Sequence, residues 1–240
     1  MDIKDFSKKI KYYGDKIELS FNEEQINRLY LYMNLLLEWN EKINLTAIVD
    51  PEEIILKHFI DSLTINKYIN KNKKLVDVGT GAGFPGIPLG IYRDDLEITL
   101  VDSLNKRINF LNIVIEKLGL KNIKTIHSRV EEFGKNKKER ESYDYATARA
   151  VANLSVLSEY LIPTVKVDGS CICMKGSNVE EELEQSKNAI KCLGGKIENV
   201  ETFKLPENDI NRNIIIIKKI KNTPAKFPRK PGTPAKEPIV

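Results

Sequence analysis

The sequence lacks a long hydrophobic run. No apolar stretch approaches the roughly 18 to 20 residues that a transmembrane helix needs. Its opening, MDIKDFSKKIKYYGDK, is charged, whereas a secretory leader needs an apolar core of about 7 to 15 residues. We therefore expect no membrane association and no secretion, and we predict a cytoplasmic protein.

Cysteine is scarce as well. The chain has three, an odd number that does not fit a disulfide framework. Cys171 and Cys173 alternate in an expected strand, where we place them on opposite faces, so we expect no shared disulfide and no metal site. Reduced thiols are typical of the cytoplasm. The 240 residues, 41% hydrophobic, suffice for a sizeable core of one or two domains without crosslinks.

Neither sign of charge dominates the sequence, since the formal net charge is only +4, but the positive charge is unevenly distributed along the chain. Residues 218–240 hold seven Lys/Arg and one acid, which is +6, so the other 217 residues carry −2. The same segment contains five prolines. This composition fits two alternatives, a solvated disordered terminus or a tail that contacts phosphate groups.

The first part of the chain, residues 1–70, is expected to be helical and to pack on the remainder of the protein. An apolar stripe with helical spacing runs through residues 20–40, and Ser20 and Glu23 have the spacing of a capping box at its start. A second helix is predicted to begin at Asp50 and Pro51, a cap residue followed by proline in the first turn.

From Lys74 the pattern changes to alternating strands and helices, which predicts parallel strands joined by crossover helices. The expected strands span residues 74–79, 96–102, 123–127, 143–148 and 169–175, and the main helices 104–118, 153–162 and 179–192. Two final strands, 196–204 and 213–220, have no helix between them and should form an antiparallel hairpin. We thus predict an α/β domain over residues 71–221, a mostly parallel, seven-stranded, Rossmann-like sheet with one antiparallel strand, followed by a tail at 222–240.

The stretch DVGTGAGFPG, residues 77–86, joins the first strand to a short helix and fits two ligands. Its second half, from Gly81 to Gly86, is the G-x-G-x-x-G of dinucleotide sites. Its first half, Asp77-x-Gly79-x-Gly81-x-Gly83, is the acidic-glycine pattern of S-adenosylmethionine (AdoMet) sites. Glycines let a backbone approach a ligand closely, and ligands of open α/β sheets bind at the carboxyl ends of strands.

Three features favour AdoMet over NAD. Asp77 can hold the methionine ammonium group, directly or through water, but would repel a pyrophosphate. Pro85 removes one of the backbone N–H groups on which pyrophosphate binding depends. The terminal hairpin is typical of AdoMet-dependent methyltransferases. Asp102, which ends the second strand, can accept hydrogen bonds from the ribose of either ligand. An NAD-dependent oxidoreductase and a nucleotide-binding module without catalysis remain the alternatives.

Five stretches together resemble one family. They are DVGTGAGFPGIPL, NLTAI at 44–48, HFIDS at 58–62, ATARAVANL at 146–154 and FPRKPGTPAKEP at 227–238. In this combination they resemble the bacterial small-subunit (16S) ribosomal RNA guanine-N7 methyltransferase G family, also called glucose-inhibited division protein B. The resemblance covers the whole chain and implies a class I AdoMet-methyltransferase fold. It also implies methyl transfer from AdoMet to N7 of one guanine in the decoding region.

The implied partner is small-subunit ribosomal RNA or the ribosomal subunit, and we expect a monomer. The resemblance places AdoMet against Gly79 and Phe84, with Val130 and Glu131 beside the adenine and Arg149 at the far edge of the pocket. An ordinary solvated helix start is the alternative for residues 129–131. An AdoMet methyltransferase acting on another RNA, a protein or a small molecule is the alternative for the activity.

The target atom predicts a simple mechanism. Guanine N7 carries an in-plane lone pair and no proton, so its attack on the sulfonium methyl needs no general base, and alignment of the reactants is the expected source of catalysis. Arg149 could bind guanine O6 or an RNA phosphate. Its alternative role is a structural ion pair with Asp77 or Asp102. His58 is expected either to line the site or order a loop, or to be a packing residue.

The basic tail is predicted to bind RNA phosphates. Its cations Lys226, Arg229, Lys230 and Lys236 are interspersed with prolines. Prolines favour an extended chain, which would keep these charges spaced along one side. Contacts of this kind position RNA without reading its sequence.

Overall fold

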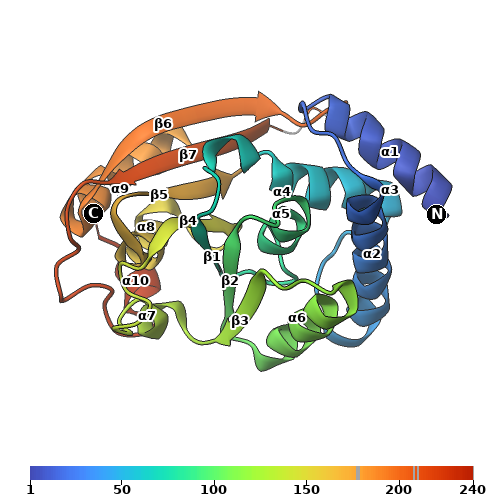
Figure 1. Ribbon diagram of the computed structural model, residues 1–240. Helices are drawn as coiled ribbons and strands as arrows, with labels where there is room; N and C mark the ends of the chain where they lie inside the picture. The colour runs from blue at the N-terminus through green and yellow to red at the C-terminus, as the bar shows by residue number, and fades with distance from the viewer. Residues whose placement is uncertain (177–178, 208, 210, 240) are drawn as a thin grey trace.

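A seven-stranded sheet forms the middle layer of the computed structural model, with helices on both faces (Figure 1). The structure describes residues 1–176, 179–207, 209 and 211–239. In this part of the chain the strand order is β3-β2-β1-β4-β5-β7-β6. The strands are β1 (Lys74–Val78), β2 (Glu97–Asp102), β3 (Ile123–His127), β4 (Tyr143–Arg149), β5 (Val165–Lys175), β6 (Gly195–Lys204) and β7 (Asn211–Lys219).

The pairing confirms the predicted α/β sheet. Strands β3, β2, β1, β4 and β5 pair in parallel, and β7 runs antiparallel to both β5 and β6. Parallel neighbours arise because each crossover passes through a helix and returns the chain to the same edge. The expected hairpin loop includes residues 208 and 210, which lie outside the described residues.

Side chains of each strand alternate between the two faces and supply two separate cores. In β5, Ile172 belongs to one core, whereas Cys171 and Cys173 both belong to the other. The expectation that the two cysteines point to opposite faces was wrong, because side chains two residues apart on a strand share a face. Burial raises the pKa of both thiols, that of Cys173 to about 12, so they act as apolar core residues.

One face of the sheet is covered by the N-terminal helices (Figure 1). These are α1 (Ile3–Asp15), α2 (Glu23–Ile43), α3 (Pro51–Ile54), the π-helix η1 (Ile55–Ile60), α4 (Asp61–Leu63) and the 3₁₀ turn η2 (Asn66–Tyr68). Residues 1–70 were expected to be helical, but the sequence did not predict α1 as a separate helix. The start of α3 at Asp50 and Pro51 is confirmed, and the Asp50 side chain accepts a hydrogen bond from the backbone of Glu53.

The predicted capping box of α2 was wrong by two residues. Asn22 caps the helix: its side chain accepts from the backbone of Gln25, whose side chain accepts from the backbone of Asn22. Ser20 and Glu23 have the same three-residue spacing, so spacing alone could not separate the two candidates. None of the helices in the described part of the chain is long and apolar enough to cross a bilayer.

Helices α5 (Gly86–Tyr92) and α6 (Asn105–Leu118) complete the first face. The opposite face is covered by α8 (Leu154–Leu161), the turn η3 (Ile162–Thr164) and α9 (Glu180–Leu193). The short helix α7 (Val130–Phe133) follows β3, and α10 (Thr233–Lys236) lies within the tail, close to α8. Figure 1 shows α7, α8 and α10 gathered on the same side of the sheet.

The tail packs on the body. Phe227 and Pro228 are buried, and Arg140 donates hydrogen bonds to the carbonyl oxygens of Thr223 (2.7 Å) and Phe227 (2.7 Å). These contacts favour the ordered alternative over the solvated one. The expectation of an extended tail was wrong at α10, because Pro234 sits in the first turn of that helix, where its missing N–H costs nothing.

Candidate active site

A cleft of about 430 Å³ lies where four parallel strands end. Its walls come from the segments that follow β1, β2, β3 and β4, and from the tail. The lining residues are Val78, Gly79, Val101, Asp102, Ser103, Arg107, Ser128, Arg129, Val130, Glu131, Ala150, Val151, Ala152, Tyr160, Gly232 and Ala235. Ligands of open α/β sheets bind at this edge.

The glycine loop forms one wall of the cleft. Gly79 and Gly81 have φ angles of +66° and +62°, in the left-handed region that favours glycine. A Cβ atom on Gly79 would lie 2.9 Å from Val151 Cγ2, so this position also requires the absence of a side chain. Asp102 holds the loop, because its Oδ2 accepts from the Gly81 backbone (2.9 Å) and its Oδ1 from that of Leu104 (2.9 Å).

Asp77 lies beneath the loop and does not line the cleft. Its side chain is fully buried, and its Oδ2 accepts from Thr80 Oγ1 (2.7 Å) and the Gly86 backbone (2.9 Å). Its Oδ1 is buried and has no hydrogen-bond partner among the described residues. Burial raises the pKa of Asp77 to about 6, against the lowering effect of these hydrogen bonds. A buried carboxylate with one unpartnered oxygen is expected to attract a cation.

Glu131 connects the cleft to the tail. It is buried at the start of α7, and its Oε1 accepts a hydrogen bond from the Gly232 backbone (2.7 Å). Arg229 anchors the same segment, since its guanidinium group donates to both carboxylate oxygens of Glu159, a side chain only 1% exposed. Arg229 is thus engaged in a bidentate ion pair, whereas Lys226, Lys230 and Lys236 are exposed.

A second group of side chains, the Arg149 cluster, surrounds the guanidinium group at the end of β4. Arg149 Nη1 donates to the Lys57 carbonyl (3.1 Å) and to Asp61 Oδ2 (3.1 Å), and Nη2 contacts His58 Nδ1 (3.2 Å). The guanidinium carbon lies 4.9 Å from the centre of the Phe84 ring. Burial lowers the pKa of Arg149, and the Asp61 carboxylate opposes that shift.

The cluster fixes the protonation of His58. A guanidinium group can only donate, so His58 Nδ1 accepts from Arg149, and Nε2 carries the proton that faces Thr46 Oγ1 at 2.9 Å. Burial and the positive charge of Arg149 lower the pKa of His58 to about 3. The ring also stacks on Phe84, with centroids 4.4 Å apart. His58 is therefore a neutral ring with both nitrogens engaged.

Asp61 is the centre of the cluster and was not singled out from the sequence. Its two oxygens accept from Arg149 (3.1 Å) and from Arg212 Nε (3.0 Å), residues 88 and 151 positions away. The alternative ion pair expected for Arg149 is present, but with Asp61 in place of Asp77 or Asp102. The HFIDS motif could have pointed to Asp61, since this residue lies one turn after His58. In the structure Asp61 directly follows the π-helix η1. Such helices occur frequently at functional sites.

The structure divides the predicted site residues between these two places. Gly79, Asp102, Val130 and Glu131 line the cleft. Phe84, His58 and Arg149 form the cluster. Gly81 and Gly83 belong to the loop between them, and Asp77 lies beneath that loop, near the end of β1. The sequence did not point to the cleft-lining Val151, Tyr160, Gly232 and Ala235 individually, although Val151 lies in the ATARAVANL motif and the last two in the FPRKPGTPAKEP motif.

Comparison with known proteins settles the family. The family model for rRNA small subunit methyltransferase G matches residues 25–215. Ribosomal RNA small subunit methyltransferase G of Clostridium perfringens (strain 13) is 55% identical over 227 residues, which cover 94% of this chain and 95% of the relative. The chain belongs to this family. Its relative of the same name in Acetivibrio thermocellus is 56% identical over 222 residues, covering 92% of this chain and 91% of the relative.

Membership in the methyltransferase G family confirms the resemblance inferred from the five motifs. The matched range contains the glycine loop, Asp61, Arg149 and Arg212, whereas the basic tail lies beyond its end. The long coverage of the relatives shows that their likeness extends beyond the sheet to the N-terminal helices.

Solved structures support the fold of this methyltransferase G family member. A 16S rRNA (adenine(1408)-N(1))-methyltransferase mutant from Catenulisporales acidiphilia, solved with cosubstrate SAM, is 14% identical with a TM-score of 0.53, covering 64% of this chain and 88% of that chain. A SAM dependent methyltransferase from Aquifex aeolicus is 16% identical with a TM-score of 0.52, covering 70% and 93%. The class I methyltransferase fold implied by the family resemblance is thereby confirmed.

Proposed function

We propose that this chain transfers the methyl group of AdoMet to N7 of a guanine in small-subunit ribosomal RNA, in the cytoplasm and as a monomer. The observation that carries the proposal is the match to rRNA small subunit methyltransferase G along more than nine-tenths of the chain. The cleft at the carboxyl ends of β1 to β4 supports it, because that edge of the sheet is where the donor would bind.

The residues of the cleft fit AdoMet. Asp102 faces it as an acceptor for ribose hydroxyl groups, and Val130 offers an apolar side chain and backbone to the adenine. Glu131 already accepts from Gly232, so its proposed role is to hold the tail beside the adenine. The unpartnered Oδ1 of Asp77 fits the positive ammonium group of the methionine portion, reached directly or through water. When bound, AdoMet supplies an electrophilic methyl group on a sulfonium centre.

We place the acceptor guanine next to the Arg149 cluster. Phe84 and Arg149, which the sequence had placed against AdoMet, are absent from the cleft lining and pack on each other. Arg149 keeps 15% of its side chain exposed, and its guanidinium group is proposed to contact guanine O6 or an RNA phosphate. Its other donors are bound by Asp61 and Lys57, so its direction is fixed in advance.

The proposed reaction uses no general base, since N7 has no proton to lose. His58 supports this mechanism, because both ring nitrogens are hydrogen-bonded and its pKa, lowered by burial to about 3, keeps the ring neutral. Its proposed role is to hold Arg149 and Phe84 in place. Catalysis then comes from the alignment of N7 with the methyl group in a protected site.

The tail is proposed to contribute to RNA binding in two ways. Lys226, Lys230 and Lys236 are exposed and would contact phosphates. Arg229, which we also expected to contact phosphate, would instead act through its ion pair with Glu159, which holds these lysines beside the cleft.

The decisive experiment is methyl transfer from labelled AdoMet to purified RNA, followed by identification of the modified base. Naked small-subunit RNA, the assembled small subunit and large-subunit RNA are offered in parallel, the last as the control. We expect label in N7-methylguanine at one position of the small-subunit substrates. Label in another base, or only in large-subunit RNA, would contradict the proposal and leave an AdoMet methyltransferase of different specificity.

A further inference from the structure

A groove lies at the opposite edge of the sheet from the cleft. It has a volume of about 370 Å³ and is bordered by the residues that begin β1, β2, β3 and β4. Four lysines, Lys74, Lys121, Lys124 and Lys138, line it, and we call it the lysine groove. Since β2 spans six residues at about 3.3 Å each, a strand's length separates the groove from the cleft. A single bound nucleotide could not reach both.

The positive charge of the lysine groove is largely free. Of its four lysines, only Lys74 has an ion-pair partner among the described residues, Glu97 at 3.6 Å. Glu139, the other acid of the lining, accepts a hydrogen bond from Tyr143 (2.5 Å). Lys121, Lys124 and Lys138 are exposed and come from two regions that are distant in sequence. Their ammonium groups are available to an anionic partner.

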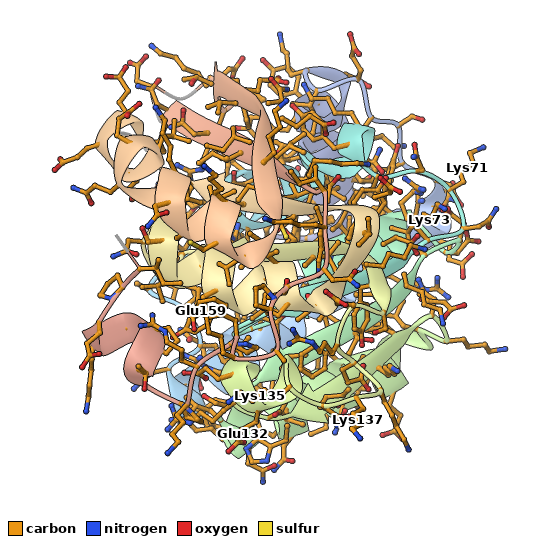
Figure 2. All side chains as sticks on the ribbon, turned by 90° about the vertical axis from the view of Figure 1, so that its left-hand side faces the viewer. Lys71, Lys73, Glu132, Lys135, Lys137 and Glu159 are labelled. Carbon is orange, nitrogen blue, oxygen red and sulfur yellow. The ribbon has the colours of Figure 1, made fainter. Side chains whose placement is uncertain are left out.

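The surrounding surface extends this charge. Lys71 and Lys73 precede β1, and Lys135 and Lys137 belong to the loop before β4. Figure 2 shows the first two on the right of the molecule and the other two at the bottom. Lys73 is 3.6 Å from Asp144, but the other three have no ion-pair partner in the part of the chain that the structure describes.

The polar groups on the floor of the groove are already satisfied within the protein. The Asn122 side chain donates to the carbonyl oxygens of Gly90 and Arg93, both at 3.1 Å, and Thr99 Oγ1 accepts from Tyr143. Recognition in the groove therefore rests on ammonium groups, which bind phosphates as point charges without reading base edges.

We propose that the lysine groove binds the phosphate backbone of ribosomal RNA at a segment away from the methylated guanine. The inference rests on the proposed RNA substrate and extends it, because the catalytic cleft and the part of the tail that lines it, Gly232 and Ala235, lie at the other edge of the sheet. A large folded RNA contacts two edges of the enzyme at once, whereas a small substrate does not. The second contact increases affinity by positioning the RNA.

The test is a triple variant, Lys121→Gln, Lys124→Gln and Lys138→Gln, in the full chain. Its control is the variant Lys187→Gln, Lys191→Gln and Lys196→Gln, which removes the same charge from α9 and the start of β6. Affinity for naked small-subunit RNA is measured at several salt concentrations, together with AdoMet affinity and the kinetics of methyl transfer.

We expect the groove variant to bind RNA at least about tenfold more weakly than the wild type. The magnitude of the slope of log affinity against log salt concentration should decrease by about 2 to 3. AdoMet affinity and kcat at saturating RNA should stay at the wild-type value, while KM for RNA rises. RNA affinity and salt slope equal to those of the control variant would overturn the inference. A loss of affinity for the assembled subunit without a loss for naked RNA would also overturn the inference, since that pattern indicates a ribosomal protein as the partner.

This outcome is separable from a failure of the proposed function. If wild-type protein methylates no small-subunit RNA, the proposed function fails before any variant is compared. If wild-type protein is active and only the difference between the two triple variants is missing, the lysine groove fails alone.

Discussion

The cleft and the Arg149 cluster are built in different ways, although the glycine loop contributes to both. Most residues that line the cleft come from the ends of β1, β2, β3 and β4 and from the segments that follow them. The cluster consists of charged and aromatic side chains from four separate parts of the chain, with Asp61 accepting hydrogen bonds from Arg149 and Arg212. A cleft of the first kind depends on loop conformation, whereas a cluster of the second kind depends on the balance of buried charge.

The largest effect is expected from Asp61→Ala. This change leaves two arginines, Arg149 and Arg212, without their shared carboxylate in a largely buried setting, which costs about 3 to 5 kcal/mol of unfolding free energy. Denaturant unfolding measures the loss. Asp61→Asn keeps a hydrogen-bond acceptor but not the charge, so its unfolding free energy should lie between those of the wild type and Asp61→Ala. The control Asp15→Ala, at the exposed end of α1, should change stability by less than about 0.5 kcal/mol. Equal values for Asp61→Ala and the control would show that the cluster adds no stability.

The second largest effect is expected from Arg149→Ala. This variant distinguishes the two regions, because turnover on RNA reports on the cluster and AdoMet affinity reports on the cleft. Because Arg149 does not line the cleft, AdoMet affinity should be retained while turnover on small-subunit RNA falls by about 100-fold, the usual loss of one preorganised donor. Single-turnover methyl transfer and equilibrium AdoMet binding give the two values. Arg28→Ala, which breaks only a surface pair with Glu24, is the control. Unchanged turnover with normal AdoMet affinity would exclude a role for Arg149 in positioning the guanine.

The cleft is tested by comparing two glycines of the same loop. Gly79→Ala and Gly81→Ala impose similar left-handed strain, of about 1 to 2 kcal/mol. Only at Gly79 does the new methyl group also meet Val151, at 2.9 Å, whereas at Gly81 nothing lies within 4 Å. We expect a lower melting temperature for Gly79→Ala than for Gly81→Ala. The difference should shrink when both are compared in a Val151→Ala background, and a difference that persists there would contradict the steric explanation.

The last comparison is a pH dependence at Asp77. Burial raises its folded-state pKa from 3.8 to about 6, so the native protein holds this proton more tightly than the unfolded chain between about pH 4 and 6. The contribution of Asp77 to stability therefore decreases as pH rises through that window. Subtracting the unfolding curve of Asp77→Asn isolates it, and a contribution that increases with pH would contradict the raised pKa. AdoMet affinity of the wild type should increase over the same window, as the carboxylate ionises beside the ammonium group.

The contrast between cleft and cluster also explains which predictions from sequence succeeded. The mostly parallel sheet and its single antiparallel strand followed from alternating periodicity and from the missing helix before β7, whereas the order of the strands in the sheet came only from the structure. Asp102 and Gly79 line the cleft, because a residue at the carboxyl end of a parallel strand has its position set by that strand, and their contact with AdoMet stays a prediction. Arg149 also ends a parallel strand, yet its guanidinium group turned to Asp61 and Phe84.

Local patterns failed where two candidates competed. Ser20 with Glu23 and Asn22 with Gln25 are equally spaced, and in the structure the second pair forms the capping box. Arg229 was assigned to phosphate from composition, but the buried Glu159 of α8 binds it. A charge count cannot identify such a pair, because the two residues are 70 positions apart.

The order of the elements, the glycine loop and the membership of the family could all be read from the sequence, since they depend on residues close together or in a fixed order. Folding established which charges are paired inside the protein and which remain for a partner. Asp61 forms ion pairs with two arginines, and Arg229 forms one with Glu159. Lys121, Lys124 and Lys138, in contrast, remain exposed at the far edge of the sheet. The physical reason is that a charge is paired by distance in space, which only the folded chain sets.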